Sequence, residues 1–85
     1  MPAYFSSMDT IGQVFGAVLY KIRQQKGLTQ EKLAERSNVD RKYIYLLEKG
    51  KRQPTLTTIF ALASALAISP LELIEEVLKQ LKSEQ

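Results

Sequence analysis

The sequence predicts an all-α fold of five short helices, and three observations support this expectation. Apolar residues recur at the three- and four-residue spacing of an amphipathic helix over most of the chain after residue 10. No stretch alternates between apolar and polar residues, so no β-strand is expected. Residues that typically begin or end helices separate the periodic segments at short intervals. We therefore expect one domain over residues 11–82, preceded by a flexible N-terminal arm over residues 1–10.

The first three helices are delimited by residues with known preferences at helix ends. Gly27 is placed to close the first helix, because glycine readily adopts the left-handed backbone that follows a last turn. Thr29 and Asp40 are suitable N-caps for a second and a third helix, and the third is expected to end at Gly50. Only residues 37–39 separate the second helix from the third, and this short connection fits a helix-turn-helix.

The last two helices have equally local signals. Pro54 separates the third helix from a fourth, for which Thr55 is the expected N-cap. The run Ser-Pro-Leu-Glu at 69–72 combines a capping serine, a proline suited to the first helical position and a glutamate three residues after the cap. It predicts a fifth helix that continues to about Lys82.

Composition excludes several classes of protein. The 85 residues contain neither Cys nor His, which excludes a disulfide scaffold, nearly excludes a zinc site and removes the commonest catalytic base. The carboxylates show no spacing typical of a metal or paired acid–base site, so we expect no enzyme, metal, cofactor or small-molecule ligand. No apolar run is long enough for a membrane helix and no signal peptide is found, so a cytoplasmic location is expected.

The charge is distributed unevenly along the chain. The net charge is +3, yet residues 1–52 carry +5 and residues 53–85 carry −2. A basic N-terminal and middle part favours a polyanionic partner. A solvated surface with chance clustering would give the same values, so the charge must be considered together with the helix faces.

A resemblance to a known family rests on the run LTQEKLAERSNVDRKYIYLLEKGKRQPTLTTIFALASAL and on the helix start SPLELI that follows it. These residues resemble the helix-turn-helix of the phage repressor and Cro family, often called the XRE family, and the resemblance covers about residues 15–78. It implies a five-helix, repressor-like domain that binds double-stranded DNA. Single-domain members of this length resemble the controller proteins of restriction–modification systems and Cro-type repressors. Asn38 departs from the usual turn glycine but tolerates left-handed backbone, and residues 1–10 are left unexplained.

The third helix supports a DNA-binding role independently of the resemblance. At 100° per residue, its residues separate into an apolar side and a cationic side. The apolar side holds Tyr43, Ile44 and Leu47, and the cationic side holds Arg41, Lys42, Tyr45 and Lys49. A cationic face on a short helix with an apolar back is what readout of the major groove needs, and the absence of an acid on that face disfavours a merely solvated surface.

Base contacts are assigned to three residues of this face. Arg41 is expected to bond guanine O6 and N7 in bidentate fashion. Lys42 is suited equally to a base or to a phosphate. Tyr45 is suited to a thymine methyl group through its ring or to a phosphate through its hydroxyl. Leu46, at the edge of the face, is suited to a methyl contact or to local packing.

Phosphate contacts and an ion pair follow from the family resemblance. Gln30 opens the second helix, where family members bind a phosphate with the side chain and the helix N-terminus. The expected phosphate contacts are Gln30, Tyr43, Lys51 and Arg52, with partial burial as the alternative for Tyr43. The resemblance also implies a semi-buried ion pair between Arg23 and Glu48, which would fix the first helix against the third.

The fifth helix carries an apolar stripe that spans roughly 160° of its circumference, wider than one core face usually needs. We expect one edge of the stripe to meet the core and the other to meet a second subunit. The residues assigned to dimerisation are Leu73, Val77 and Leu81. The alternative is that a small domain uses the whole stripe for its own core.

The resulting hypothesis is a homodimeric, sequence-specific DNA-binding transcriptional regulator that recognises an inverted-repeat operator. A homodimer is favoured because one short helix makes too few contacts for specific binding. The main alternative is an antitoxin-type helix-turn-helix protein whose principal partner is a toxin protein.

Overall fold

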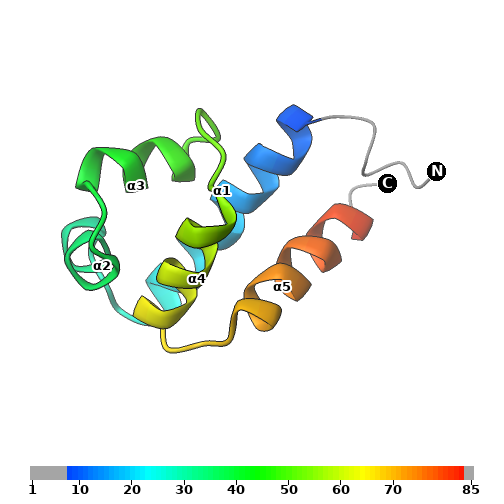
Figure 1. Ribbon diagram of the computed structural model, residues 1–85. Coiled ribbons are helices and arrows are strands. Elements are labelled where there is room, and N and C mark those ends of the chain that lie inside the picture. Colours follow the sequence, from blue (N-terminus) through cyan, green and yellow to red (C-terminus); the bar gives the residue numbers. More distant parts are fainter. Residues whose placement is uncertain (1–7, 84–85) are drawn as a thin grey trace.

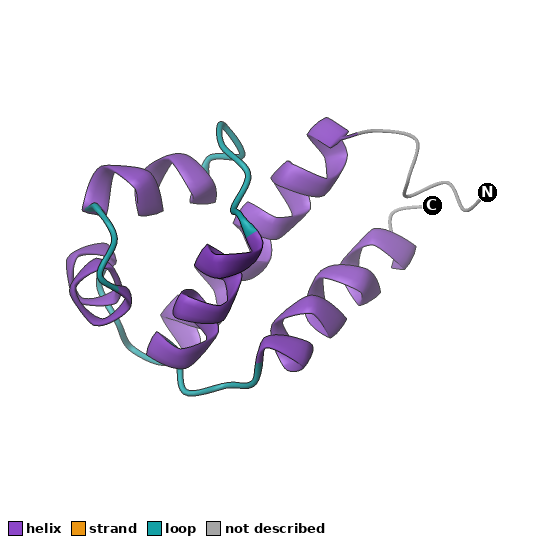
Figure 2. Cartoon of the chain, in the orientation of Figure 1, coloured by secondary structure: helices purple, strands orange, loops and turns teal. Residues whose placement is uncertain are grey.

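The computed structural model describes residues 8–83, and these residues form five helices and no strand (Figure 1; Figure 2). The helices are α1 (Met8–Gln25), α2 (Gln30–Ser37), α3 (Arg41–Glu48), α4 (Leu56–Ala65) and α5 (Pro70–Ser83). The predicted all-α class and the predicted order of helices are confirmed.

The boundaries of the domain differ slightly from the expected ones. α1 begins at Met8, so its first turn lies within the segment expected to be an arm. The rest of that segment, residues 1–7, lies outside the described residues. α5 continues to Ser83, one residue beyond the expected end of the domain.

The N-caps predicted from the sequence are present. In each case a side-chain oxygen accepts a hydrogen bond from a backbone N–H in the first turn, which satisfies a donor that the helix itself leaves unpaired. The acceptor and donor residues are Thr29 and Lys32 for α2, Asp40 and Lys42 for α3, Thr55 and Thr58 for α4, and Ser69 and Glu72 for α5. At α5 the bonding is reciprocal, because the Glu72 carboxylate also accepts from the Ser69 N–H at 3.0 Å.

The turn between α2 and α3 depends on a left-handed residue. Asn38 has φ 57° and ψ 41°, as expected from its position in the sequence. This conformation lets the Val39 N–H donate to the Ala34 carbonyl at 3.0 Å, which closes the end of α2. The chain then turns directly into α3, and the two helices pack against each other.

The core draws buried apolar side chains from all five helices. The largest fully buried side chains are Leu19, Leu33, Ile44, Leu47, Leu62, Leu66 and Leu73. α1 packs against α3 and against α5, and α2 packs against α3 and α4. Figure 1 shows the consequence: α2 and α3 lie together at one end of the molecule and α5 lies at the other.

The structure corrects the dimerisation residues predicted on α5. Leu73, Val77 and Leu81 are 0%, 7% and 6% exposed and belong to the core of a single chain. Their assignment to a dimer interface is wrong, because the inward edge of the stripe is the one that packs against α1 and α4. The other edge stays outside: Leu71 is 68% exposed and Ile74 is 42% exposed.

No single helix in residues 8–83 combines the length and apolar character that a membrane crossing requires. α4 and α5 meet that requirement only when counted together, and they are bent by 105° at the connection between them.

Candidate nucleic-acid interface

α3 presents an exposed surface that is held in place by a buried back. Ile44 and Leu47 are completely buried and anchor the helix in the core. On the opposite side Arg41, Lys42 and Tyr45 are exposed and line one shallow hollow. The structure therefore brings together the three side chains that the sequence analysis assigned to base contacts.

The charges on this surface are available to a ligand. Among the described residues, Arg41, Lys42 and Lys51 take part in no ion pair. Lys51 and Arg52 are exposed in the connection from α3 to α4, just beyond the end of α3. The cationic surface thus continues from the first turn of α3 into the loop that follows it.

Two tyrosines order cations on this surface. The Lys49 Nζ atom lies 5.6 Å from the centroid of the Tyr45 ring, and the Arg52 Cζ atom lies 6.0 Å from that of Tyr43. Tyr43 is half-buried, and its hydroxyl donates to the Gln53 carbonyl at 3.4 Å. Tyr43 therefore joins α3 to the loop, and the partial burial considered in the sequence analysis is present.

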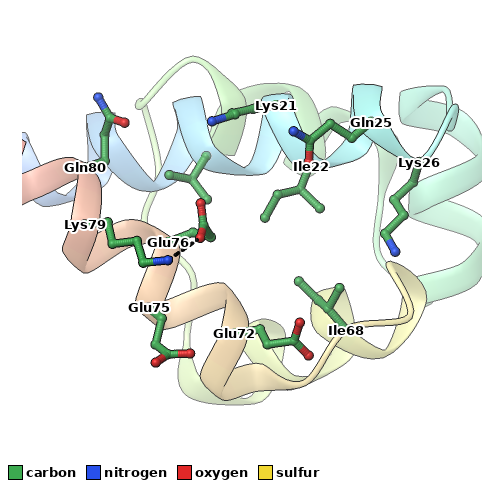
Figure 3. A pocket seen from close by; sticks show the side chains of 11 residues that line it. Lys21, Ile22, Gln25, Lys26, Ile68, Glu72, Glu75, Glu76, Lys79 and Gln80 are labelled. Atoms are coloured by element: carbon green, nitrogen blue, oxygen red, sulfur yellow. Dashed lines mark hydrogen bonds and ion pairs between the residues drawn. The ribbon is translucent and has the colours of Figure 1, made fainter.

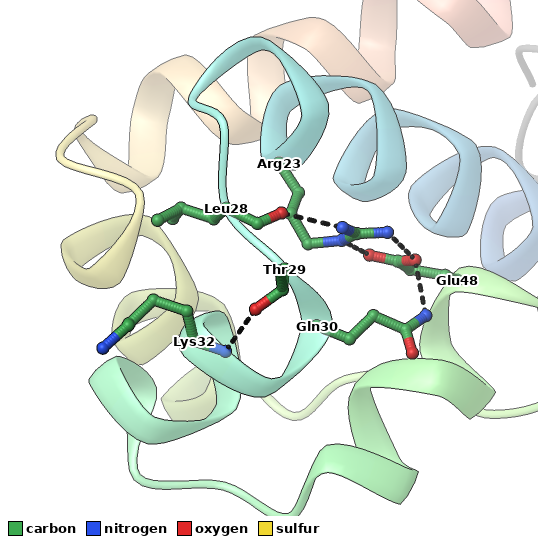
Figure 4. Close-up of polar contacts among 6 residues, drawn as sticks. All are labelled: Arg23, Leu28, Thr29, Gln30, Lys32 and Glu48. Atoms are coloured by element: carbon green, nitrogen blue, oxygen red, sulfur yellow. Dashed lines mark hydrogen bonds and ion pairs between the residues drawn. The ribbon is translucent and has the colours of Figure 1, made fainter.

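The predicted ion pair between Arg23 and Glu48 is present and joins α1 to α3 (Figure 4). The Arg23 Nε and Nη2 atoms donate to the two carboxylate oxygens of Glu48 at 2.6 and 2.9 Å. The Nη1 atom donates to the Leu28 carbonyl at 2.8 Å. The two side chains are only 7% and 5% exposed, so the geometry is bidentate and almost dry.

The ion pair also changes the electrostatics of Arg23. The hydrogen bond from Arg23 to Glu48 outweighs the opposing effect of burial and raises the pKa of the Arg23 guanidinium above its ordinary value. Every buried side-chain nitrogen and oxygen in the described residues has a hydrogen-bond partner. A buried pair of this kind is not strong evidence of net stabilisation, but removal of either partner leaves an uncompensated charge.

Gln30 has an internal partner that the sequence analysis did not anticipate. Its Nε2 atom donates to the Glu48 Oε1 atom at 3.0 Å, so the side chain at the start of α2 is tied to the buried ion pair (Figure 4). The Gln30 amide has a second hydrogen that can donate to a phosphate. The phosphate contact of Gln30 therefore stays a prediction. No sequence signal pointed to the link, because it depends on the angle at which α2 meets α3.

A close approach of α1 to α3 was likewise not predicted from the sequence. Gly16 is buried in the middle of α1 and faces the end of α3. A Cβ atom at this position would lie 2.9 Å from the Glu48 carbonyl oxygen and even closer to that of Leu47. The backbone of α3 leaves no room for a side chain there, so glycine sets the distance between the two helices.

These features define a class of protein. A short cationic helix that follows another helix through a left-handed turn, and that is anchored by its apolar back, is a helix-turn-helix DNA-binding domain. A family model described as Helix-turn-helix matches residues 19–73, from the middle of α1 into α5. The chain belongs to this helix-turn-helix family, and the resemblance to the phage repressor and Cro proteins is confirmed.

Individual relatives indicate which helix-turn-helix proteins this chain is similar to. An HTH-type transcriptional regulator of Sinorhizobium fredii is 40% identical over 62 residues, which cover 73% of this chain and 80% of that protein. The control protein C.MunI of a Mycoplasma species is 34% identical over 86% of this chain and 100% of its own length. The crystal structure of the restriction–modification controller protein C.AhdI from Aeromonas hydrophila is similar with a TM-score of 0.70 and 46% identity, over 72% of this chain and 92% of that one.

The chain is therefore a helix-turn-helix transcriptional regulator, similar to restriction–modification controller proteins. Its homologues are regulators of a DNA-binding family and not enzymes. Membership of this family implies double-stranded DNA as the partner.

Proposed function

We propose that the protein binds an inverted-repeat operator as a homodimer, with α3 of each subunit in the major groove. The observation that carries this proposal is the surface of α3, where Arg41, Lys42 and Tyr45 are exposed together above a fully buried back. The width of the major groove admits an α-helix, and base edges there differ for every base pair. A rigidly anchored helix with donors at its first turn can therefore distinguish sequences.

The contacts divide into readout and positioning. Arg41 lies in the first turn of α3 and is proposed to reach a guanine edge, with Lys42 and Tyr45 contacting neighbouring bases or phosphates. Lys51 and Arg52, in the loop after α3, are proposed to contact phosphates only. The N-terminus of α2 adds backbone N–H donors for a further phosphate, with Gln30 beside them.

A dimer supplies the second set of contacts, and α4 and α5 offer an apolar surface for it. The exposed large apolar side chains of these helices are Leu56, Phe60, Leu71 and Ile74, and the half-buried Leu78 lies one turn after Ile74 on α5. We call them the apolar strip. Large exposed apolar side chains gathered on adjacent helices are typical of a protein interface. Two subunits related by a two-fold axis would bind half-sites about 10 bp apart or a multiple of that spacing.

The similarity to controller proteins and to a phage immunity repressor supports a role in controlling genes through occupancy of such a site. The phage repressor is 39% identical over 67 residues, which are 79% of this chain but only 44% of that protein. We propose that this chain regulates through DNA binding and dimerisation.

Selection of bound DNA from a random duplex pool tests the proposal. The enriched duplexes are expected to share an inverted repeat, and sedimentation of the complex is expected to show two chains per duplex. If the protein retains no duplex above the level of bulk DNA, the proposal fails. The antitoxin-type alternative, in which the apolar strip binds a toxin protein, would then be favoured.

A further inference from the structure

A groove of about 440 Å³ runs between the second half of α1 and α5 (Figure 3). Its floor is apolar: Val18 and Ile22 come from α1, and Ile68 comes from the connection between α4 and α5. Figure 3 shows Ile22 and Ile68 pointing toward each other across the groove. None of the residues proposed to contact DNA lines this groove.

The two rims of the groove carry opposite charges. On the α1 side the charged residues are Lys21 and Lys26. On the α5 side the charged residues are Glu72, Glu75, Glu76 and Lys79. Glu72 is occupied by the Ser69 cap and Glu76 pairs with Lys79 at 3.4 Å, whereas Lys21, Lys26 and Glu75 have no ion pair among the described residues. Free charges of one sign therefore remain on each rim.

The groove opens away from α3. At 100° per residue, Lys21 lies roughly 160° around α1 from Arg23, the residue that pairs with Glu48 of α3. DNA bound to α3 would therefore leave the groove accessible.

The groove is also separate from the apolar strip. On α5, Glu72 and Glu76 lie on one side of the buried stripe, and Ile74 and Leu78 lie on the other side. Glu75 is the exception, because it lies four residues after Leu71 and three before Leu78 and so borders the strip. A dimer formed through the strip would leave the apolar floor and the basic rim of the groove open.

The chemistry of the groove suits a polypeptide better than a small ligand. A small-molecule site has a few convergent polar groups that fix the ligand, whereas the unpaired charged side chains of this groove, Lys21, Lys26 and Glu75, are exposed and stand on its two rims. What the groove offers instead is an apolar floor between a basic and an acidic rim, and such a pattern of charges favours one orientation of a bound segment.

We infer that this groove is a docking site for a segment of a second protein. The segment places an apolar side chain against Ile22 and Ile68, an acidic group toward Lys21 and Lys26, and a basic group toward Glu75. Because the groove faces away from α3 and from the apolar strip, the regulator holds this partner while it is bound to DNA. The inference goes beyond the proposed operator binding and does not depend on it.

A phage-displayed library of short random peptides is the probe, selected on the intact protein in the presence of excess duplex DNA. The enriched peptides are expected to carry an apolar residue between an acid and a base. A synthetic peptide of that sequence should shift the NMR signals of α1 and α5 residues around the groove and leave those of α3 unchanged.

The matched variant is the double exchange Lys21→Glu/Glu75→Lys, which keeps the net charge of the protein constant. Both residues are exposed and neither makes a side-chain interaction among the described residues, so the fold should not change. The exchange should weaken peptide binding about tenfold or more, because two attractions become repulsions. The control variant Lys82→Glu, exposed and outside the groove, should bind like the parent.

Three results would overturn the inference: no peptide enriched over the matrix alone, equal binding to the parent and to the exchange variant, or a changed oligomeric state of the exchange variant. The last result, if Lys21→Glu alone reproduces it, would show that the groove holds a second copy of this chain, because Lys21 lies on α1 and outside the apolar strip. DNA binding by the same variant, measured separately, reports on the proposed operator binding, so failure of one proposal is distinguishable from failure of the other.

Discussion

α3 and α5 both bury one face in the same core, but they turn opposite chemistry outward. α3 exposes Arg41, Lys42 and Tyr45, whereas the outer edge of α5 exposes Leu71 and Ile74. A cationic surface binds a polyanion by releasing counterions, and that attraction weakens steeply with salt. An apolar surface associates because it is removed from water, and salt does not screen that effect. One small domain thus carries two associations that respond differently to the same solution.

The largest expected effect is a difference in stability between substitutions on the buried and on the exposed edge of the apolar stripe of α5. Leu73→Asp puts a charge at a fully buried position, where removal of the apolar side chain and desolvation of the carboxylate cost several kcal/mol. That cost is comparable with the whole stability of a domain, about 5–15 kcal/mol, so the chain should unfold. Ile74→Asp, one residue later on the exposed edge, should leave a folded monomer. Circular dichroism and sedimentation distinguish the two variants. A folded Leu73→Asp protein would refute the core assignment, and a dimeric Ile74→Asp protein would exclude this edge from the interface.

The next largest effect concerns the link between α1 and α3. Arg23→Ala and Glu48→Ala should each lower the free energy of unfolding by about 3–5 kcal/mol, because the remaining partner is left buried and charged. Glu35→Ala is the matched control, since Glu35 pairs with Lys32 on the surface and should change stability by no more than about 0.5 kcal/mol. Urea denaturation measures all three. Equal midpoints for Glu48→Ala and Glu35→Ala would show that the buried pair contributes no more than a surface pair.

A smaller effect should distinguish two glycines of α1. Gly16→Ala should destabilise by about 1–3 kcal/mol, because the new methyl group meets the backbone of α3, which cannot give way. Gly12→Ala should be neutral or stabilising, since its methyl group would meet only the flexible Gln53 side chain at 3.2 Å and alanine favours helix. Thermal denaturation of the two variants compares them. Similar stabilities would show that α1 can move away from α3 without cost.

The same contrast between α3 and α5 explains which features of the structure could be predicted from the sequence alone. The helix starts were predicted because capping is local: Thr29, Asp40, Thr55 and Ser69 each bond a backbone N–H within three residues. Which face of α3 is exposed was predicted because the apolar side of this helix is narrow, so only one face can be buried. On α5 the stripe is wide, and the inward edge depends on the angles of α1 and α4, which no local signal gives. For the same reason the link from Gln30 to Glu48 and the close approach at Gly16 were not foreseen.

Binding of Arg41→Ala and Arg52→Ala to a panel of single-base variants of the selected operator, at several salt concentrations, tests whether the exposed face of α3 reads sequence. Arg41→Ala should cost about 1–3 kcal/mol on the preferred site and relax the preference at one base pair in each half-site. Arg52→Ala should weaken binding evenly across the panel and lower the salt dependence by about one unit for each phosphate that a subunit no longer binds. If the two variants bind every site with the same reduced affinity and show the same salt dependence, Arg41 does not read a base, and the account of α3 as the sequence-reading helix is contradicted.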